Sequence, residues 1–138
     1  RLYTSLKTRN APNAQTWNGG IGRAQLCWLE GQLAQADRAG QQVVVFCHYP
    51  VFPENSHNLW NDQEVLRVLE SHPCVTAYLN GHNHAGNYAQ RCGIHYVTLP
   101  GMVETPDTTA YALVQTQPTD LKLIGYGRTP SRQLEYRS

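Results

Sequence analysis

Three histidines lie where metal ligands are expected in an α/β protein. His48 directly follows the apolar run Val43–Cys47, while His82 and His84 follow the apolar run Cys74–Leu79. In an open parallel sheet, the loops at the carboxyl ends of neighbouring strands converge on one crevice, so these side chains should meet there. Imidazole is a good ligand for Mn, Fe and Zn. The sequence therefore predicts a metal site formed by these three histidines.

The spacing of His82 and His84 favours this interpretation. Two residues apart, they can share one face of a strand or approach one ion from different sides of a tight turn. Gly81 and Gly86 flank the pair, and glycine permits the backbone conformations that such a turn requires. A lone strand-end histidine such as His48 is as often a hydrogen-bonded surface residue as a ligand. His48-Tyr49-Pro50 at the end of one apolar run, followed by Gly81-His82-Asn83-His84 after the next, favours metal ligation.

The other histidines are weaker candidates. His57 lies in the loop after His48, where it is either a substrate contact or a solvated loop residue. His72 is near the carboxyl end of an expected helix, where a partial positive charge is favourable, so we predict a structural role. His95 falls in an alternating strand pattern and is expected to be a hydrogen-bonded sheet residue.

Periodicity predicts the elements that position these residues. Leu26, Leu29, Leu33 and Ala36 recur at three- and four-residue intervals and indicate a helix from about residue 22 to residue 39. A second helix should begin at Asn61 and end before Pro73, between two buried strands, which makes a β-α-β unit with a right-handed crossover. An antiparallel meander follows, with strands expected at 87–90, 94–99, 110–116 and 121–126.

These elements predict an α/β (α+β) fold. We expect residues 1–20 to be an irregular lead-in and residues 21–138 to form a single domain. The formal net charge is +1 and the basic residues are scattered, so neither nucleic acid nor an anionic membrane is an expected partner. No apolar run reaches the roughly 20 residues that span a bilayer. The four dispersed cysteines are typical of reduced structural thiols, and we expect a cytoplasmic protein.

Several segments together resemble the calcineurin-like metallophosphoesterase superfamily. Within it, the chain is most similar to the manganese-dependent ADP-ribose/CDP-alcohol diphosphatase family. The resemblance covers residues 18 to about 132. The similar segments are Asn18–Gly22, Gln25–Leu29, His48–Glu54, Trp60–Asn61, Gly81–Tyr88, Gly93–Val97, Gly101–Thr105 and Gly125–Arg128.

The resemblance implies a reaction and a ligand set. It implies that His48 and His82 bind one divalent metal and His84 a second, with manganese expected and iron or zinc as alternatives. A hydroxide held between two metals attacks phosphorus in such centres. The implied substrates are small nucleoside diphosphate-linked compounds such as ADP-ribose and CDP-alcohols. Phe52, His57 and Asn83 are candidate substrate contacts, although Phe52 could equally pack its loop onto the core.

The chain also departs from the superfamily pattern. The motifs Asp-x-His, Gly-Asp-x-x-Asp and Gly-Asn-His-Asp/Glu, which supply the carboxylates, do not occur. The sequence therefore predicts a partial β-sandwich equivalent to the C-terminal half of a metallophosphoesterase, with no catalytic residue assigned and no activity alone. It would form a homo-oligomer or bind a missing N-terminal half. The alternatives are an inactive truncated relic that serves as an oligomeric binding module and, less favoured, a structural zinc site.

Overall fold

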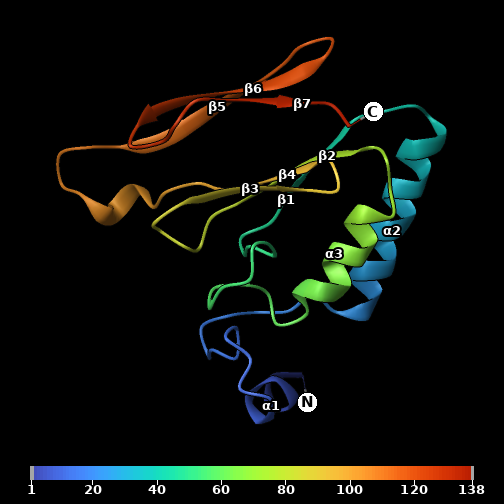
Figure 1. Cartoon of the computed structure of the whole chain (residues 1–138), viewed down its shortest axis with the longest axis vertical. Coiled ribbons are helices and arrows are strands. Elements are labelled where there is room, and N and C mark those ends of the chain that lie inside the picture. The colour runs from blue at the N-terminus through green and yellow to red at the C-terminus, as the bar shows by residue number, and fades with distance from the viewer. Residues whose placement is uncertain (1, 138) are drawn as a thin grey trace.

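Two stacked sheets, with two helices covering the outer face of the larger one, make up most of the molecule (Figure 1). The computed structural model describes residues 2–137. The elements are α1 (Leu2–Thr8), α2 (Arg23–Arg38), β1 (Val43–Phe46), α3 (Asp62–Glu70), β2 (Val75–Asn80), β3 (Asn87–Arg91), β4 (Ile94–Thr98), the 3-10 helix η1 (Met102–Glu104), β5 (Ala110–Thr116), β6 (Asp120–Gly127) and β7 (Arg132–Glu135).

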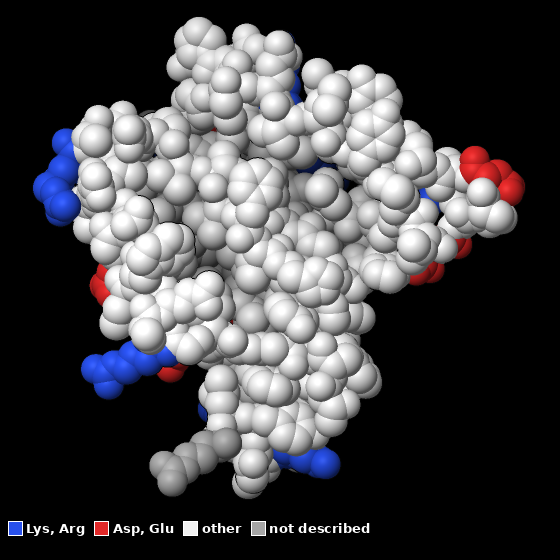
Figure 2. Space-filling model, turned by 180° about the vertical axis from the view of Figure 1, so that it is seen from behind, with Lys and Arg blue, Asp and Glu red and all other residues white. Residues whose placement is uncertain are grey.

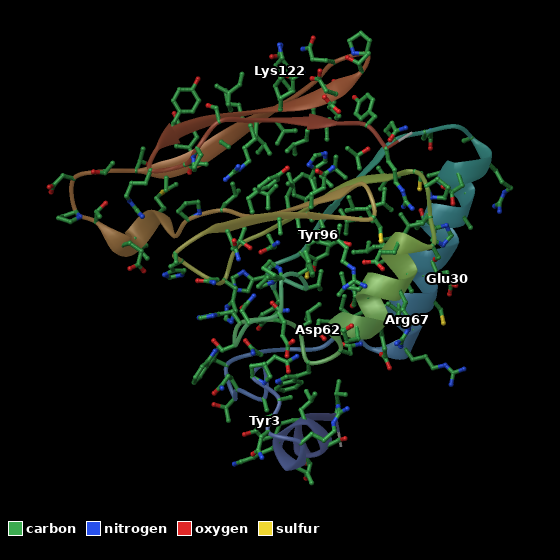
Figure 3. All side chains as sticks on the ribbon, in the orientation of Figure 1. Tyr3, Glu30, Asp62, Arg67, Tyr96 and Lys122 are labelled. Atoms are coloured by element: carbon green, nitrogen blue, oxygen red, sulfur yellow. The ribbon has the colours of Figure 1, made fainter. Side chains whose placement is uncertain are left out.

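The larger sheet has the strand order β1-β2-β4-β3. β1, β2 and β4 are mutually parallel, and β3 is antiparallel to β4. Every residue of β2 and β4 is buried, as expected for strands covered on both faces. Tyr78 and Tyr96 pack on the helix side of this sheet, where Figure 3 shows Tyr96, and Leu79 and Val97 pack on the other side.

The second sheet is the antiparallel meander β5-β6-β7. Its inner face contributes Leu121, Leu123 and Leu134 to a core shared with Leu79 and Val97 of the larger sheet. Because alternate residues of a strand point to opposite faces, Lys122 projects from the outer face, as Figure 3 shows. The second sheet thus covers one face of the parallel strands, and α2 and α3 cover the other.

The predicted fold class is confirmed: the chain is a mixed α/β protein with a β-α-β unit. The predicted four-stranded meander is wrong in its first half, because β3 and β4 join the larger sheet, where β4 is parallel to β2, and only β5, β6 and β7 form a meander. The irregular segment predicted over residues 1–20 is wrong for Leu2–Thr8, which is helical. This helix is too short to show a period, and its only buried residue is Leu6. Strand β7 was also missed, because Leu134 is its one buried residue and leaves no alternation to detect. The division into a lead-in and one domain stays a prediction.

The surface agrees with the even charge distribution of the sequence. On the face drawn in Figure 2, charged side chains are scattered and most of the surface is white. Each helix among residues 2–137 is too short or too polar to cross a lipid bilayer.

Candidate metal-binding site

The parallel pairing of β1 and β2 places His48 beside His82. Phe46 lies opposite Leu79 in this pair, and the ladder continues past the strand ends. The Gly81 amide donates a hydrogen bond to the His48 carbonyl at 3.1 Å. His48 Nε2 consequently lies 3.2 Å from His82 Nδ1, although the two residues are 34 positions apart.

The turn after β2 holds His82 in an unusual backbone conformation. His82 has φ 64°, in the left-handed region that residues other than glycine rarely adopt, and Gly86 has φ 72°. Both Gly81 and Gly86 were expected to provide the backbone conformation of the turn. Gly86 does have a positive φ, but at the start of the turn the residue with a positive φ is His82 rather than Gly81. Such a conformation costs about 1–3 kcal/mol and is typical of functional sites.

Asn18 determines which nitrogen of His82 carries the proton. The side-chain Nδ2 of Asn18 donates to the Asn13 carbonyl at 3.0 Å and to the Ser56 carbonyl at 2.7 Å. Its Oδ1 therefore faces His82 Nε2, at 3.0 Å, and can only accept a hydrogen bond from it. His82 is consequently protonated at Nε2, and its Nδ1 presents a lone pair toward His48. This is the tautomer that a metal ligand requires, oriented by a neighbouring group.

Aromatic rings enclose His82. Tyr49 packs edge-on against it with ring centroids 4.6 Å apart, and His57 lies at 5.5 Å. Partial burial lowers the pKa of His82 from its ordinary value, and the neighbouring His48, His57 and His84 lower it further. His82 is therefore neutral near pH 7, as ligation requires.

His84 lines the same cleft but has a different partner. The cleft, of about 620 Å³, is bordered by His48, His82 and His84. His84 Nδ1 lies 2.5 Å from Glu104 Oε1, and both side chains are about half exposed. A β-carbon on Gly101 would lie 2.5 Å from His84 Cγ, so the absence of a side chain there lets His84 occupy this position.

The residues present fit part of a metal site. Two nitrogens that bind one ion at about 2.05 Å with tetrahedral geometry lie about 3.3 Å apart, close to the 3.2 Å between His48 and His82. Asn80 borders the cleft with both side-chain amide atoms buried and without a partner among residues 2–137, and its carbonyl oxygen suits Mn. Within the same residues, however, no three His, Cys, Asp or Glu side chains gather closely enough to hold an ion. Residues 2–137 therefore supply some, but not all, of the ligands that a metal site needs.

The predicted substrate contacts lie in three different environments. His57 is beside His82, and Asn83 forms the turn between the two cleft histidines, where its Oδ1 accepts a hydrogen bond from the Ala85 amide. Phe52 instead packs against Tyr96 with ring centroids 5.3 Å apart. For Phe52 the structure favours packing of the loop onto the core, and substrate contact by all three residues stays a prediction.

Three residues of this region were missed by sequence reasoning as site residues. Asn18 lies in the segment predicted to be an irregular lead-in, Tyr49 was noted only within a motif, and Glu104 lies between strands. Short loops carry no periodic signal, so the only pointers to them were the similar segments Asn18–Gly22, His48–Glu54 and Gly101–Thr105, each of which contains one of the three.

The remaining histidines have structural partners, as predicted. His72 Nδ1 lies 2.5 Å from Asp37 Oδ2. His95 bridges the two sheets: its ring nitrogens lie 3.0 Å from the Tyr88 hydroxyl and 3.1 Å from the Glu135 carbonyl. The Glu135 carbonyl can only accept, so His95 Nε2 donates and Nδ1 accepts from Tyr88. Burial lowers the pKa of His95, which keeps this neutral form.

Comparisons with known proteins agree with the motifs. The chain is 38% identical over 131 residues to the manganese-dependent ADP-ribose/CDP-alcohol diphosphatase of Bos taurus, covering 91% of this chain and 39% of that protein. The protein of the same name from Xenopus laevis is 40% identical over 126 residues, covering 88% and 35%. The chain thus spans less than half the length of these relatives. No protein-family model matches.

A solved structure shows the same fold. The crystal structure of a dimetal phosphatase from Danio rerio superimposes with a TM-score of 0.89 at 29% sequence identity. The alignment covers 99% of this chain and 49% of that one. A fold shared along nearly the whole chain, together with these identities, confirms the resemblance deduced from the motifs.

Proposed function

Because the chain is homologous to manganese-dependent ADP-ribose/CDP-alcohol diphosphatases over 91% of its length, we propose that it forms the histidine-bearing part of such a diphosphatase centre. The reaction would be hydrolysis of small nucleoside diphosphate-linked compounds, ADP-ribose or CDP-alcohols. His48 and His82 would hold one divalent metal, and His84 would contribute to a second.

One observation carries this proposal: two imidazole nitrogens lie 3.2 Å apart at the carboxyl edge of a parallel sheet, and one has its lone pair directed by Asn18. A bound divalent metal would polarise a phosphoryl oxygen and lower the pKa of a bound water. The chain itself keeps His82 neutral, orients its Nδ1 and limits water around it with Tyr49 and His57. These features prepare His82 as a ligand before the metal binds, whereas His48 Nε2, which faces the lone pair of His82 Nδ1, must lose its proton to join it.

The carboxylates that such a centre needs would come from protein segments outside residues 1–138, or from another chain. Two open strands flank the cleft and support this part of the proposal. Phe46 on edge strand β1 is 70% exposed, and Leu113 on edge strand β5 is 53% exposed. Apolar side chains on an unpaired strand edge favour further strand pairing or association.

The test is a paired measurement of hydrolysis and metal content. The purified chain is incubated with Mn²⁺ and ADP-ribose or a CDP-alcohol, beside His48→Ala, His82→Ala and a control, His95→Gln, whose histidine lies outside the cluster. Bound manganese is quantified on the same samples. We expect Mn²⁺ to bind the parent chain and His95→Gln, with both alanine variants weakened about tenfold or more.

Each outcome has a meaning for the proposal. Hydrolysis lost in both alanine variants would show that the chain supplies a working centre without further carboxylates. Manganese binding without hydrolysis supports the histidine-bearing part that requires additional ligands. Equal manganese affinity in the parent and both alanine variants would overturn the assignment and favour an inactive binding module.

A further inference from the structure

A second cavity lies between the two sheets, beside the histidine cleft. It has a volume of about 430 Å³ and is bordered by the start of β3, the end of β4 and the β6–β7 connection. Leu99 and Pro100 border both this cavity and the histidine cleft. β4 is parallel to β2, so the cavity opens at the same carboxyl edge of the sheet, one strand further along.

The charged residues that border this cavity are both basic. Among the residues that the structure describes, Arg128 and Arg132 are the charged side chains of its wall, and no Asp or Glu borders it. Neither arginine forms an ion pair with a carboxylate among residues 2–137. The guanidinium of Arg132 instead lies over the ring of Tyr88, with Cζ 4.2 Å from the centroid, which holds it in a fixed position without neutralising it. The wall therefore has a net positive charge.

Two hydrogen-bond donors of the wall have no acceptor among residues 2–137. Nη2 of Arg128 donates to the Gly101 carbonyl, whereas its Nε is buried and lacks a partner among residues 2–137. The Thr129 hydroxyl, in a residue that is 6% exposed, is also without a partner in that part of the chain. Buried donors without acceptors are rare and costly, and more so on a charged group.

A purely structural role explains only part of this arrangement. The hydrogen bond by which Arg128 holds the Gly101 loop requires a single guanidinium nitrogen, and the packing of Arg132 against Tyr88 requires no charge. Neither explains why two half-buried arginines border one cavity where residues 2–137 supply no carboxylate. Guanidinium presents its N–H groups as a planar fork that matches phosphate oxygens, and an anion would neutralise both groups at once.

We propose that this cavity binds a phosphate monoester group, held by Arg128 and Arg132. Because it adjoins the histidine cleft, the assigned ligand is the phosphate of the ester that remains when a diphosphate is cleaved there. This role rests on the proposed function; the binding of a phosphate ester does not. Cleavage of the diphosphate of ADP-ribose by water leaves two such esters, AMP and ribose 5-phosphate, of which ribose 5-phosphate is the smaller and serves as the probe.

The experiment measures binding to the metal-free chain. Ribose 5-phosphate and inorganic phosphate are titrated calorimetrically in the presence of EDTA into the parent, Arg128→Gln, Arg132→Gln, the matched control Lys122→Gln and His82→Ala. Lys122 is exposed on the outer face of the second sheet. We expect ribose 5-phosphate to bind more tightly than inorganic phosphate, and each arginine variant to weaken it about tenfold or more. Lys122→Gln and His82→Ala should bind as the parent does.

Other results would overturn the proposal. These are no binding of ribose 5-phosphate to the parent, equal binding by Arg132→Gln, or loss of binding in His82→Ala. If inorganic phosphate binds as tightly as ribose 5-phosphate, the cavity does not recognise the ester, and its assignment to the cleavage product is wrong. If Arg128→Gln fails to fold after losing its contact with Gly101, Arg132→Gln decides alone. Binding as expected in a chain whose Mn²⁺ affinity is unchanged by His48→Ala and His82→Ala would refute the proposed function and leave the cavity assignment standing.

Discussion

Replacing Asn18 by alanine should lower both the stability of the chain and its affinity for Mn²⁺. The side chain is 5% exposed and makes three hydrogen bonds, two as donor to the Asn13 and Ser56 carbonyls and one as acceptor from His82. At a net 0.5–1.5 kcal/mol each, their loss should cost about 1.5–4.5 kcal/mol of unfolding free energy. Loss of a group that orients a metal ligand reduces affinity about 10- to 100-fold.

Asn58→Ala is the matched control. Asn58 is 0% exposed and also makes three side-chain hydrogen bonds, with Asn55, Pro53 and Asp62, but none with His82. It should destabilise the chain to a similar degree and leave Mn²⁺ affinity unchanged. Asn18→Asp keeps the acceptor for His82 Nε2 and loses both donors, so it should lose stability yet retain the tautomer.

Three measurements decide the matter: urea unfolding, Mn²⁺ titration and long-range ¹H–¹⁵N correlation spectra of the histidine rings in the metal-free chain. The spectra should show His82 protonated at Nε2 in the parent and in Asn18→Asp, and a mixture of tautomers in Asn18→Ala. The reasoning is refuted if Asn18→Ala keeps the parent tautomer and Mn²⁺ affinity, or if Asn58→Ala weakens Mn²⁺ binding as strongly.

Three further predictions concern the rest of the fold. The pKa of His95 is lowered from 6.5 in the folded chain, so the free energy of unfolding should fall as the pH drops through and below 6.5. For this one proton the fall is at most about 1.4 kcal/mol per pH unit. His95→Gln should make the free energy of unfolding, measured by urea titrations at several pH values, depend less on pH. Gly101→Ala should displace His84 and lower the free energy of unfolding by about 1–3 kcal/mol. Gly31→Ala, at a helical position with open space, should raise it by about 0.5–1 kcal/mol. Equal melting temperatures of the two variants would contradict this prediction. Leu134→Ala, at a 0% exposed position, should cost about 2–5 kcal/mol in denaturant unfolding, and a cost below about 1 kcal/mol would show that β7 is not part of the core.

Much of the framework was predictable because it depends on local patterns. The helical period from Leu26 to Ala36 and the β-branched run Val43–Val45 mark elements that the structure contains within a few residues. The β-α-β order requires β1 and β2 to end at one edge, which places His48 and His82 together without knowledge of any contact. The short elements α1 and β7 have too few buried residues to produce a period, so they were not foreseen.

The sequence by itself determined that His48 and His82 would meet, because strand direction and register follow from apolar patterning and chain order. It predicted the same of His84, whose ring instead pairs with Glu104 in the same cleft. Only the tertiary structure decided what surrounds them. Asn18 reaches His82 across 64 positions, and Glu104 reaches His84 across 20, through loops without periodicity. Hydrogen bonds between such loops depend on where the packed sheets and helices place their ends, and no spacing within one segment encodes that position.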